Sequence, residues 1–381
     1  MFISGSNTQQ HNLKGVIRMV KALISPGKYV QGAGALKEAG RFIGPLGKNV
    51  LILTSKSAWR TAGATLESGL AEFRITVEHF GGECSKPEIE RVKKIAQDVG
   101  AEVIVGFGGG KTLDTAKAVA YYLDLPVAIL PSIAATDAPC SALSVIYTPE
   151  GVFEEYLVLP RNPNLVLVDT QLIAQAPARF LVSGMGDALA TKFEAEANNA
   201  AGKAALSGGT PTTTAIALAD LCYRTLIEYG YAAKLAVEKN AVTPAVEKVV
   251  EANTLLSGLG FESGGLAAAH AVHNGFTALE ATHHYYHGEK VAFSTLVQLV
   301  LEGQPMEKIY EVLEFCQTVG LPTTLAELGI ENPTRDDLMK VAQGATAQNE
   351  TIHNEPFPVT AEMVVDAILA ADALGQGEVY E

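Results

Sequence analysis

Hydrophobic residues in the first half of the chain alternate between short continuous runs and longer runs with helical spacing. The short runs are rich in Val, Ile and Leu and end at Gly, Pro or polar residues, which is typical of buried strands. We expect strands at 50–54, 75–80, 102–107, 127–131 and 165–169, and helices at 58–69, 87–99 and 112–123. Strands and helices in alternation predict a parallel sheet covered by helices on both faces.

The pattern changes near residue 180, after which strand-like runs stop and alanine-rich stretches of helical period take over. Thr210-Pro211 and Thr243-Pro244 each have the form of a helix N-cap followed by proline at the first helical position. We expect helices at 211–229, 244–256, 307–319 and 361–374. The sequence therefore predicts an α/β protein: a flexible tail over residues 1–22, a parallel-sheet, Rossmann-like domain over 23–180, and an all-α domain over 181–381.

Composition narrows the functional classes. The chain has 381 residues, of which 48% are hydrophobic and 18% charged, so it can bury substantial cores. Its net charge of -14 repels a phosphate backbone, which argues against nucleic-acid binding. No apolar run is long enough to span a membrane.

The four cysteines form no CxxC pair, which favours a reduced, cytoplasmic protein. The first 37 residues lack Asp and Glu, as transit peptides do, but their scarcity of arginine favours a tail.

A glycine-rich turn follows the strand expected at 102–107. Residues 106–114, Gly-Phe-Gly-Gly-Gly-Lys-Thr-Leu-Asp, lead from that strand into a helix. Such a turn presents backbone N–H groups and the positive helix end to an anion such as pyrophosphate. It matches neither common phosphate motif, because Val105 stands where a P-loop needs glycine and Lys111 stands where GxGxxG has its third glycine. From spacing alone, a plain tight turn explains the glycines equally well.

A second polar loop, residues 131–141, follows the strand expected at 127–131. It places hydroxyl groups and the carboxylate of Asp137 at the carboxyl edge of the predicted sheet, where ligands usually bind in such folds. The loop alone does not exclude an ordinary polar connection.

Five of the eight histidines lie within eighteen residues: His270, His273, His283, His284 and His287. His270 and His273 share one face of a predicted helix of small residues. A single histidine there is usually a hydrogen-bonded core residue, but five buried imidazoles would each need a polar partner. A metal site formed by imidazoles and a carboxylate is the simpler hypothesis.

Asp187 is the candidate carboxylate ligand. It follows two glycines in Ser183-Gly184-Met185-Gly186-Asp187, at the expected opening of an alanine-rich helix. By position alone, helix N-capping is the favoured explanation of this residue. HExxH is absent, so the histidines do not form a helix-borne metalloprotease site.

Together these segments resemble the iron-containing alcohol dehydrogenase superfamily, which has a dehydroquinate synthase-like fold, and in particular its glycerol dehydrogenase branch. The resemblance is carried by ordered blocks at 25–29, 80–84, 108–117, 136–147, 184–190 and 258–291. It implies that Asp187, His270 and His287 are metal ligands, usually of zinc, with Fe²⁺ and Mn²⁺ as alternatives. It also implies that Asp137 contacts substrate, so that Asp137 joins these three ligands as the catalytic set. His273, His283 and His284 then become pocket or supporting residues.

The resemblance also implies an NAD site and a homo-oligomer, with an octamer as one expected size. The implied NAD-binding residues are Gly108, Gly109, Gly110, Lys111, Thr112, Asp114, Ser132, Ala135, Ser141, Leu143 and Tyr147. The chain departs from the family at the end of the first strand, where Ser55 replaces an acidic residue that binds the adenosine ribose. Because no carboxylate there repels a 2′-phosphate, and because Lys56 follows, tolerance of NADP is an open hypothesis.

The implied activity is reversible oxidation of glycerol, or a related vicinal diol, to dihydroxyacetone. Two rivals share the fold: a glycerol-phosphate dehydrogenase and a dehydroquinate synthase-like lyase. Both act on phosphorylated substrates and would need several cations, yet no Lys or Arg occurs from Glu262 to Glu289. A rival of another class is a non-catalytic, nucleotide-sensing metal protein.

Overall fold

The computed structural model describes residues 20–377, and its largest sheet has six parallel strands. In spatial order they are β2 (Tyr29–Gly32), β9 (Leu165–Asp169), β6 (Val127–Pro131), β5 (Val103–Gly108), β3 (Asn49–Thr54) and β4 (Arg74–His79). The five strands predicted from hydrophobic runs are confirmed, each to within one residue at its ends. The edge strand β2 was not predicted, because its four residues are only half-buried and form no hydrophobic run.

Helices cover both faces of this sheet, as the alternation predicts. One face carries α1 (Ala39–Ile43) and α2 (Lys56–Gly69), and the other carries α3 (Lys86–Val99) and α4 (Gly110–Leu123). Val50 and Ile52 of β3 pack in the core with α2, whereas Leu51 and Leu53 pack in the core with α3 and α4. This second core continues without a break into the helical half of the chain.

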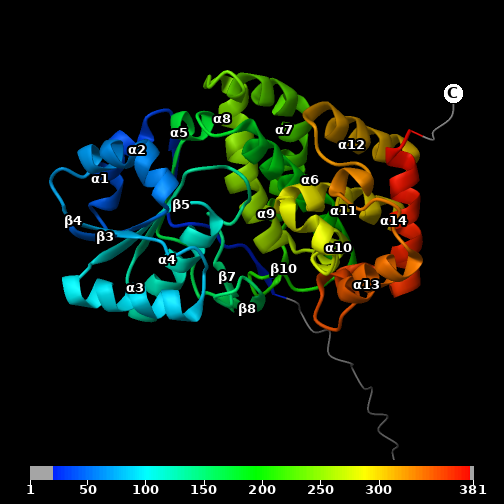
Figure 1. The fold of residues 1–381 in the computed structure, drawn as a ribbon, viewed down its shortest axis with the longest axis horizontal. Coiled ribbons are helices and arrows are strands. Elements are labelled where there is room, and N and C mark those ends of the chain that lie inside the picture. Colours follow the sequence, from blue (N-terminus) through cyan, green and yellow to red (C-terminus); the bar gives the residue numbers. More distant parts are fainter. Residues whose placement is uncertain (1–19, 378–381) are drawn as a thin grey trace, which may run out of the picture.

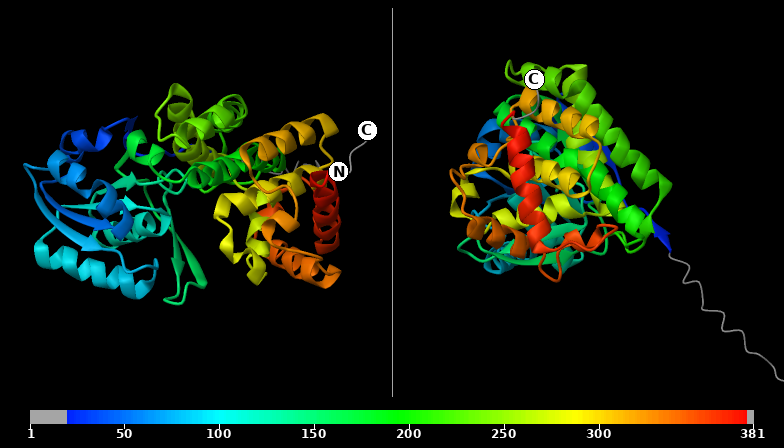
Figure 2. Two further views of the ribbon diagram at one scale, coloured as in Figure 1. Left: turned by 45° about the horizontal axis from the view of Figure 1, so that its top comes forward. Right: turned by 90° about the vertical axis from the view of Figure 1, so that its right-hand side faces the viewer.

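The second half of the chain is helical. It contains α5 (Thr170–Ala174), α6 (Ala178–Ala201), α7 (Thr213–Val237), α8 (Pro244–Glu251), α9 (Ser257–Gly264), α10 (Ala268–Phe276), α11 (His287–Leu301), α12 (Met306–Val319), α13 (Arg335–Ala345) and α14 (Ala361–Gly375). A π-helical turn over Ala252–Leu256 joins α8 to α9. The sheet and the helical half lie side by side, with the sheet mostly blue to teal and the helical half mostly green to red (Figure 1), and they remain separate in the left-hand view of Figure 2. No helix among residues 20–377 has the length and apolar character of a membrane span.

One expectation about the helical half and one about the N-terminal tail need correction. Thr210-Pro211 does not begin a helix; it forms the short strand β10, which pairs with β1 (Lys21–Ala22). Helix α7 begins two residues later, where the side chain of Thr212 accepts a hydrogen bond from the backbone of Ala215. The predicted cap at Thr243-Pro244 is confirmed. Because β1 is part of the fold, residues 20–22 do not belong to a tail, and the rest of the predicted tail lies outside the described residues.

A hairpin of β7 (Leu143–Tyr147) and β8 (Phe153–Val158) follows the second polar loop and was not predicted. Only alternate residues of β7 are fully buried, and β8 is largely exposed, so neither strand has a continuous hydrophobic run. The change from strands to helices falls between the end of β9 and the start of α6. The domain boundary placed at residue 180 remains a prediction.

Candidate metal centre and active site

Asp187, His270 and His287 come together although they lie on three different helices. The Oδ1 atom of Asp187 lies 3.3 Å from Nε2 of His270 and 3.0 Å from Nε2 of His287. One potential ligand atom from each residue lies within 4.8 Å of the other two. The Asp187 side chain is only 1% exposed, and both imidazoles are partly buried. The three residues chosen from the sequence therefore form one compact cluster.

A close crossing of α6 and α11 holds two of these residues side by side. A Cβ atom on Gly288 would lie 1.7 Å from the carbonyl oxygen of Ser183, and one on Gly186 would lie 2.2 Å from the carbonyl oxygen of Gly288. Only glycine permits such backbone contact. Asp187 follows Gly186 and His287 precedes Gly288, so the crossing brings the carboxylate to the imidazole.

The N-cap interpretation of Asp187 is wrong. Helix α6 begins at Ala178, after Pro177, and Asp187 lies in its interior. The two nearby glycines do not open the helix. Gly184 instead packs against the carbonyl oxygen of Ala134, and Gly186 against that of Gly288. A single sequence does not distinguish glycines that permit close helix packing from glycines that precede a helix.

The histidines and the neighbouring carboxylates of this cluster shift one another's pKa values. Burial alone would raise the pKa of Asp187, but the charges and hydrogen bonds of His287 and His270 hold it well below its usual value. Burial and the nearby Asp187 charge raise the pKa of Asp137 well above its usual value. Among the described residues, no Lys or Arg forms an ion pair with Asp137, Asp187 or Glu194. One carboxylate and two imidazoles suit Zn²⁺, Fe²⁺ or Mn²⁺, so these residues fit a divalent ion.

Asp137 lies directly beside the cluster, as the resemblance implied. Its backbone N–H donates to Oδ2 of Asp187 at 3.2 Å, and its carboxylate accepts a hydrogen bond from the Ser257 hydroxyl at 2.7 Å. Asn253, in the π-helical turn, donates to the carbonyl oxygens of Ala134 and Leu181, both at 3.0 Å. The second polar loop is thereby tied to α6 and to the metal ligands.

The other three histidines have different positions. The His273 ring contacts that of His287, with centroids 4.2 Å apart, and burial followed by the charge of His287 lowers the pKa of His273 well below its usual value. This agrees with a supporting role. His283 and His284 are exposed, and Nε2 of His283 lies 3.0 Å from the Thr277 carbonyl oxygen. The structure gives them a surface position after α10, and their expected place in the pocket stays a prediction.

The glycine turn lies where the direction of the sheet reverses. The chain leaves β3 toward β4 on one side and leaves β5 toward β6 on the other, which defines the usual nucleotide position between the carboxyl ends of β3 and β5. Ser55 follows β3 and its N–H donates to the Phe107 carbonyl oxygen of β5 at 3.2 Å. Ser55 also caps α2 through Ala58. The carboxyl ends of β3 and β5, which carry Ser55 and the glycine turn, are therefore adjacent.

Helix α4 begins directly at the glycine turn. Its N-cap is Gly109, which offers no side chain to the first N–H groups, and a Cβ atom on Gly110 would meet nothing within 4 Å. Open space in front of uncapped amides fits an anion such as a pyrophosphate. Lys111 pairs with Glu83, and its Nζ lies 4.8 Å from the ring centroid of Tyr147. Thr112 is buried behind the turn, against Gly108.

Lys117 organises the second polar loop and was not identified from the sequence. Its side chain is fully buried, and Nζ donates to the carbonyl oxygens of Ala138, Ser141 and Leu143 and pairs with Asp114 at 2.9 Å. Asp114 also accepts a hydrogen bond from the Val145 N–H at 3.0 Å. Asp114, Ser141 and Leu143 therefore contribute to the framework of the expected NAD site through this lysine. Ser132 is tied to the glycine turn through Gly108, and the Ala135 carbonyl oxygen accepts a hydrogen bond from Ser183.

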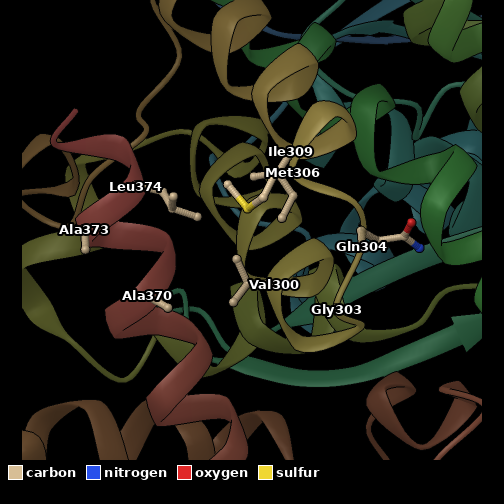
Figure 3. A pocket seen from close by; sticks show the side chains of 8 residues that line it. All are labelled: Val300, Gly303, Gln304, Met306, Ile309, Ala370, Ala373 and Leu374. Atoms are coloured by element: carbon tan, nitrogen blue, oxygen red, sulfur yellow. The ribbon is translucent and has the colours of Figure 1, made fainter. Parts of the chain in front are cut away.

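A separate apolar pocket lies between α14 and the α11–α12 connection (Figure 3). Leu374 points toward Met306 across it, and the lining contains no titratable side chain. None of its residues belongs to the metal cluster or the glycine turn, so we assign it no chemistry.

Known proteins share both the sequence and the fold. Residues 26–170 match the iron-containing alcohol dehydrogenase family. A glycerol dehydrogenase of Thermotoga maritima is 56% identical, covering 94% of this chain and 98% of its own. One of Escherichia coli is 54% identical, with 94% and 98% covered. The crystal structure of glycerol dehydrogenase from Schizosaccharomyces pombe has a TM-score of 0.91 and 41% identity, covering 94% of this chain and 92% of its own.

A parallel α/β domain joined to helices that hold an Asp-His-His cluster, together with this similarity, defines an oxidoreductase. The chain belongs to the iron-containing alcohol dehydrogenase family. Within that family, the relatives just described are glycerol dehydrogenases, and the similarity extends over almost the whole length of both chains.

Proposed function

We propose that this protein is a metal- and NAD-dependent glycerol dehydrogenase that interconverts glycerol, or related vicinal diols, and dihydroxyacetone. The observation that carries the proposal is the hydrogen bond from the Asp137 N–H to Asp187 at 3.2 Å. It joins the loop at the sheet edge to the candidate metal ligands, so that a nucleotide site and a metal site become parts of one active site. The glycerol dehydrogenase relatives support the choice of substrate.

Asp187, His270 and His287 would hold the divalent ion, for which we propose zinc, with iron or manganese as alternatives. Bound there, such an ion supplies a Lewis acid that favours the alkoxide form of a substrate hydroxyl. With only three protein ligands, such an ion would remain accessible to the substrate. One carboxylate oxygen of Asp137 accepts a hydrogen bond from the Ser257 hydroxyl. We propose that the other oxygen accepts a hydrogen bond from a second hydroxyl group of the substrate.

The glycine turn and the second loop would hold the dinucleotide, which supplies the hydride acceptor when bound. The residues of this proposed site are Ser55, Gly108, Gly109, Gly110, Lys111, Thr112, Asp114, Ser132, Ala135, Ser141, Leu143 and Tyr147. The uncapped start of α4 suits the pyrophosphate. Ser55 supplies no carboxylate against a 2′-phosphate, so we propose NAD as the principal cofactor with NADP tolerated. The homo-oligomer, the octamer and the cytoplasmic location remain predictions.

The rivals that act on phosphorylated substrates are less well supported. A phosphate group needs cations that are free to bind it. Lys117 is already committed to Asp114 and three carbonyl oxygens. The glycerol dehydrogenase relatives point the same way.

The test is turnover by purified protein of defined metal content. We expect oxidation of glycerol and 1,2-propanediol and reduction of dihydroxyacetone, with little activity on glycerol 3-phosphate. The kcat/KM with NAD should exceed that with NADP, and NADP should still support measurable turnover. A preference for glycerol 3-phosphate would overturn the proposed substrate, and binding of NAD without turnover of any diol would favour a nucleotide sensor. Undetectable turnover with NADP would contradict only the proposed tolerance of NADP.

A further inference from the structure

Helix α10, which carries His270, begins without a local cap. Its N-cap position is Ala267, whose side chain cannot accept a hydrogen bond. Helices normally satisfy their first N–H groups with Ser, Thr, Asp or Asn at this position. In α10, four consecutive backbone N–H groups are nevertheless bound by side chains from other elements. The donors are Ala267, Ala268, Ala269 and His270.

Three buried side chains supply the acceptors. Oε1 of Glu194, on α6, accepts from both Ala267 and His270 at 2.9 Å. Oε1 of Glu355, after the turn at Thr351–Asn354, accepts from Ala268 at 3.2 Å, and Oε1 of Gln298, on α11, accepts from Ala269 at 2.8 Å. Two of the three are carboxylates, which also suit the positive end of a helix. We call Glu194, Glu355 and Gln298 the α10 cradle.

Glu194 makes one contact that the other two members of the cradle do not. Its second oxygen, Oε2, lies 2.6 Å from Nδ1 of His270, and its side chain is 0% exposed. A carboxylate can only accept at this contact, so Nδ1 carries a proton, and a metal ion bound to this imidazole would have to bind at Nε2. That Nε2 is the atom that lies 3.3 Å from Asp187. Glu194 therefore fixes both the helix that bears His270 and the tautomer of its ring.

We propose that Glu194 is a positioning residue that sets the metal affinity of this site by orienting His270, while Glu355 and Gln298 serve only to anchor the helix. Partners behind a metal-binding histidine fix its ring and raise its basicity, and their loss typically lowers metal affinity 10- to 100-fold. The inference rests on the metal site of the proposed function. It goes beyond that site by assigning a role to a residue that does not touch the metal.

Glu194→Gln separates the two roles of Glu194. The amide oxygen of glutamine can still accept from the N–H groups of Ala267 and His270, but its NH₂ group cannot accept the proton of Nδ1. Glu355→Gln is the matched control, because it replaces another buried carboxylate of the cradle and keeps the acceptor for Ala268. Metal affinity would be measured on protein without substrate, by competition for zinc with a chromogenic chelator.

We expect Glu194→Gln to weaken zinc binding about 10- to 100-fold, and Glu355→Gln to change it less than about threefold. Equal affinities for Glu194→Gln and the unchanged protein, or an equal loss in both variants, would overturn the inference. An unchanged protein that binds no zinc at all would instead overturn the proposed metal site.

A crystal structure of the zinc-loaded, unchanged protein tests the same inference without any variant. It should show zinc on Nε2 of His270 and the Nδ1–Glu194 hydrogen bond intact. Zinc on Nδ1, or Glu194 itself as a ligand, would contradict the assignment.

Discussion

Glu355 shows how an anchoring residue can make stability depend on pH. Its side chain is 4% exposed, and one of its oxygens accepts a hydrogen bond from the Ala268 N–H. Burial, and then the neighbouring charge of Glu302, raise the pKa of Glu355 to about 8. Glu194 adds a further negative charge, and burial also raises the pKa of Glu302. The folded protein therefore keeps a proton on this carboxyl that the unfolded chain releases near pH 4.5.

We predict that Glu355→Gln makes the protein less sensitive to alkaline pH. Because the folded state binds the proton more tightly, the free energy of unfolding falls as pH rises from about 4.5 to about 8 and is level above that. Glutamine does not titrate, so the variant should be more stable than the unchanged protein at pH 9, by on the order of 1–3 kcal/mol, and little different at pH 5. Denaturant unfolding of metal-free protein at both pH values measures this. The same difference at both pH values would contradict it.

Functional residues could be predicted where they form a rare sequence pattern, and they could not be predicted where the pattern is common. Five clustered histidines pointed to a metal site, and family resemblance selected His270 and His287 from among them. Glu194 could not be found, because it and Glu196 are two glutamates of one helix, and only the fold buries the first and exposes the second. Its spacing of seven residues from Asp187, two helical turns, was the one available signal.

At the scale of elements, the crossing of α6 and α11 is the contact most sensitive to a small change. We predict that Gly288→Ala destabilises the protein by about 3 kcal/mol or more, because the new methyl group would meet the Ser183 carbonyl oxygen at 1.7 Å and the Asp187 nitrogen at 2.8 Å. Both are backbone atoms, so the helices themselves would have to separate. The melting temperature and zinc affinity should fall together.

Gly110→Ala is the control for that substitution. Its Cβ atom would meet nothing within 4 Å, and it lies at the start of α4. Its effect on stability should stay within about 1 kcal/mol. A Gly288→Ala variant as stable as Gly110→Ala would show that the two helices are not in the close contact described.

Strands could be predicted where burial on both faces determined their hydrophobic pattern. Strands β3, β5, β6 and β9 are buried on both faces, so their hydrophobic runs identified them. Strand β8 is mostly exposed, and β10 has two residues, so neither leaves such a run. The cap pattern at Thr210-Pro211 lies two residues before the true cap, because Thr212 is the residue that caps α7.

At the scale of the whole molecule, the proposed active site belongs to neither half alone. The α/β half contributes the glycine turn and Asp137, the helical half contributes Asp187, His270 and His287, and one hydrophobic core runs through both. The sequence predicted the α/β half and the helical half. It could not predict the hydrogen bond between Asp137 and Asp187, because that contact spans 50 residues and depends on helix packing.

The central claim is that one divalent ion held by Asp187, His270 and His287 is required for diol oxidation. The most direct measurement is glycerol turnover with NAD in chelator-treated protein, followed during titration with zinc, for the unchanged protein and for Asp187→Asn. We predict that turnover is lost on chelation and returns at about one zinc per chain, and that Asp187→Asn neither binds zinc tightly nor recovers. Full turnover by metal-free protein, or by Asp187→Asn, would contradict the account.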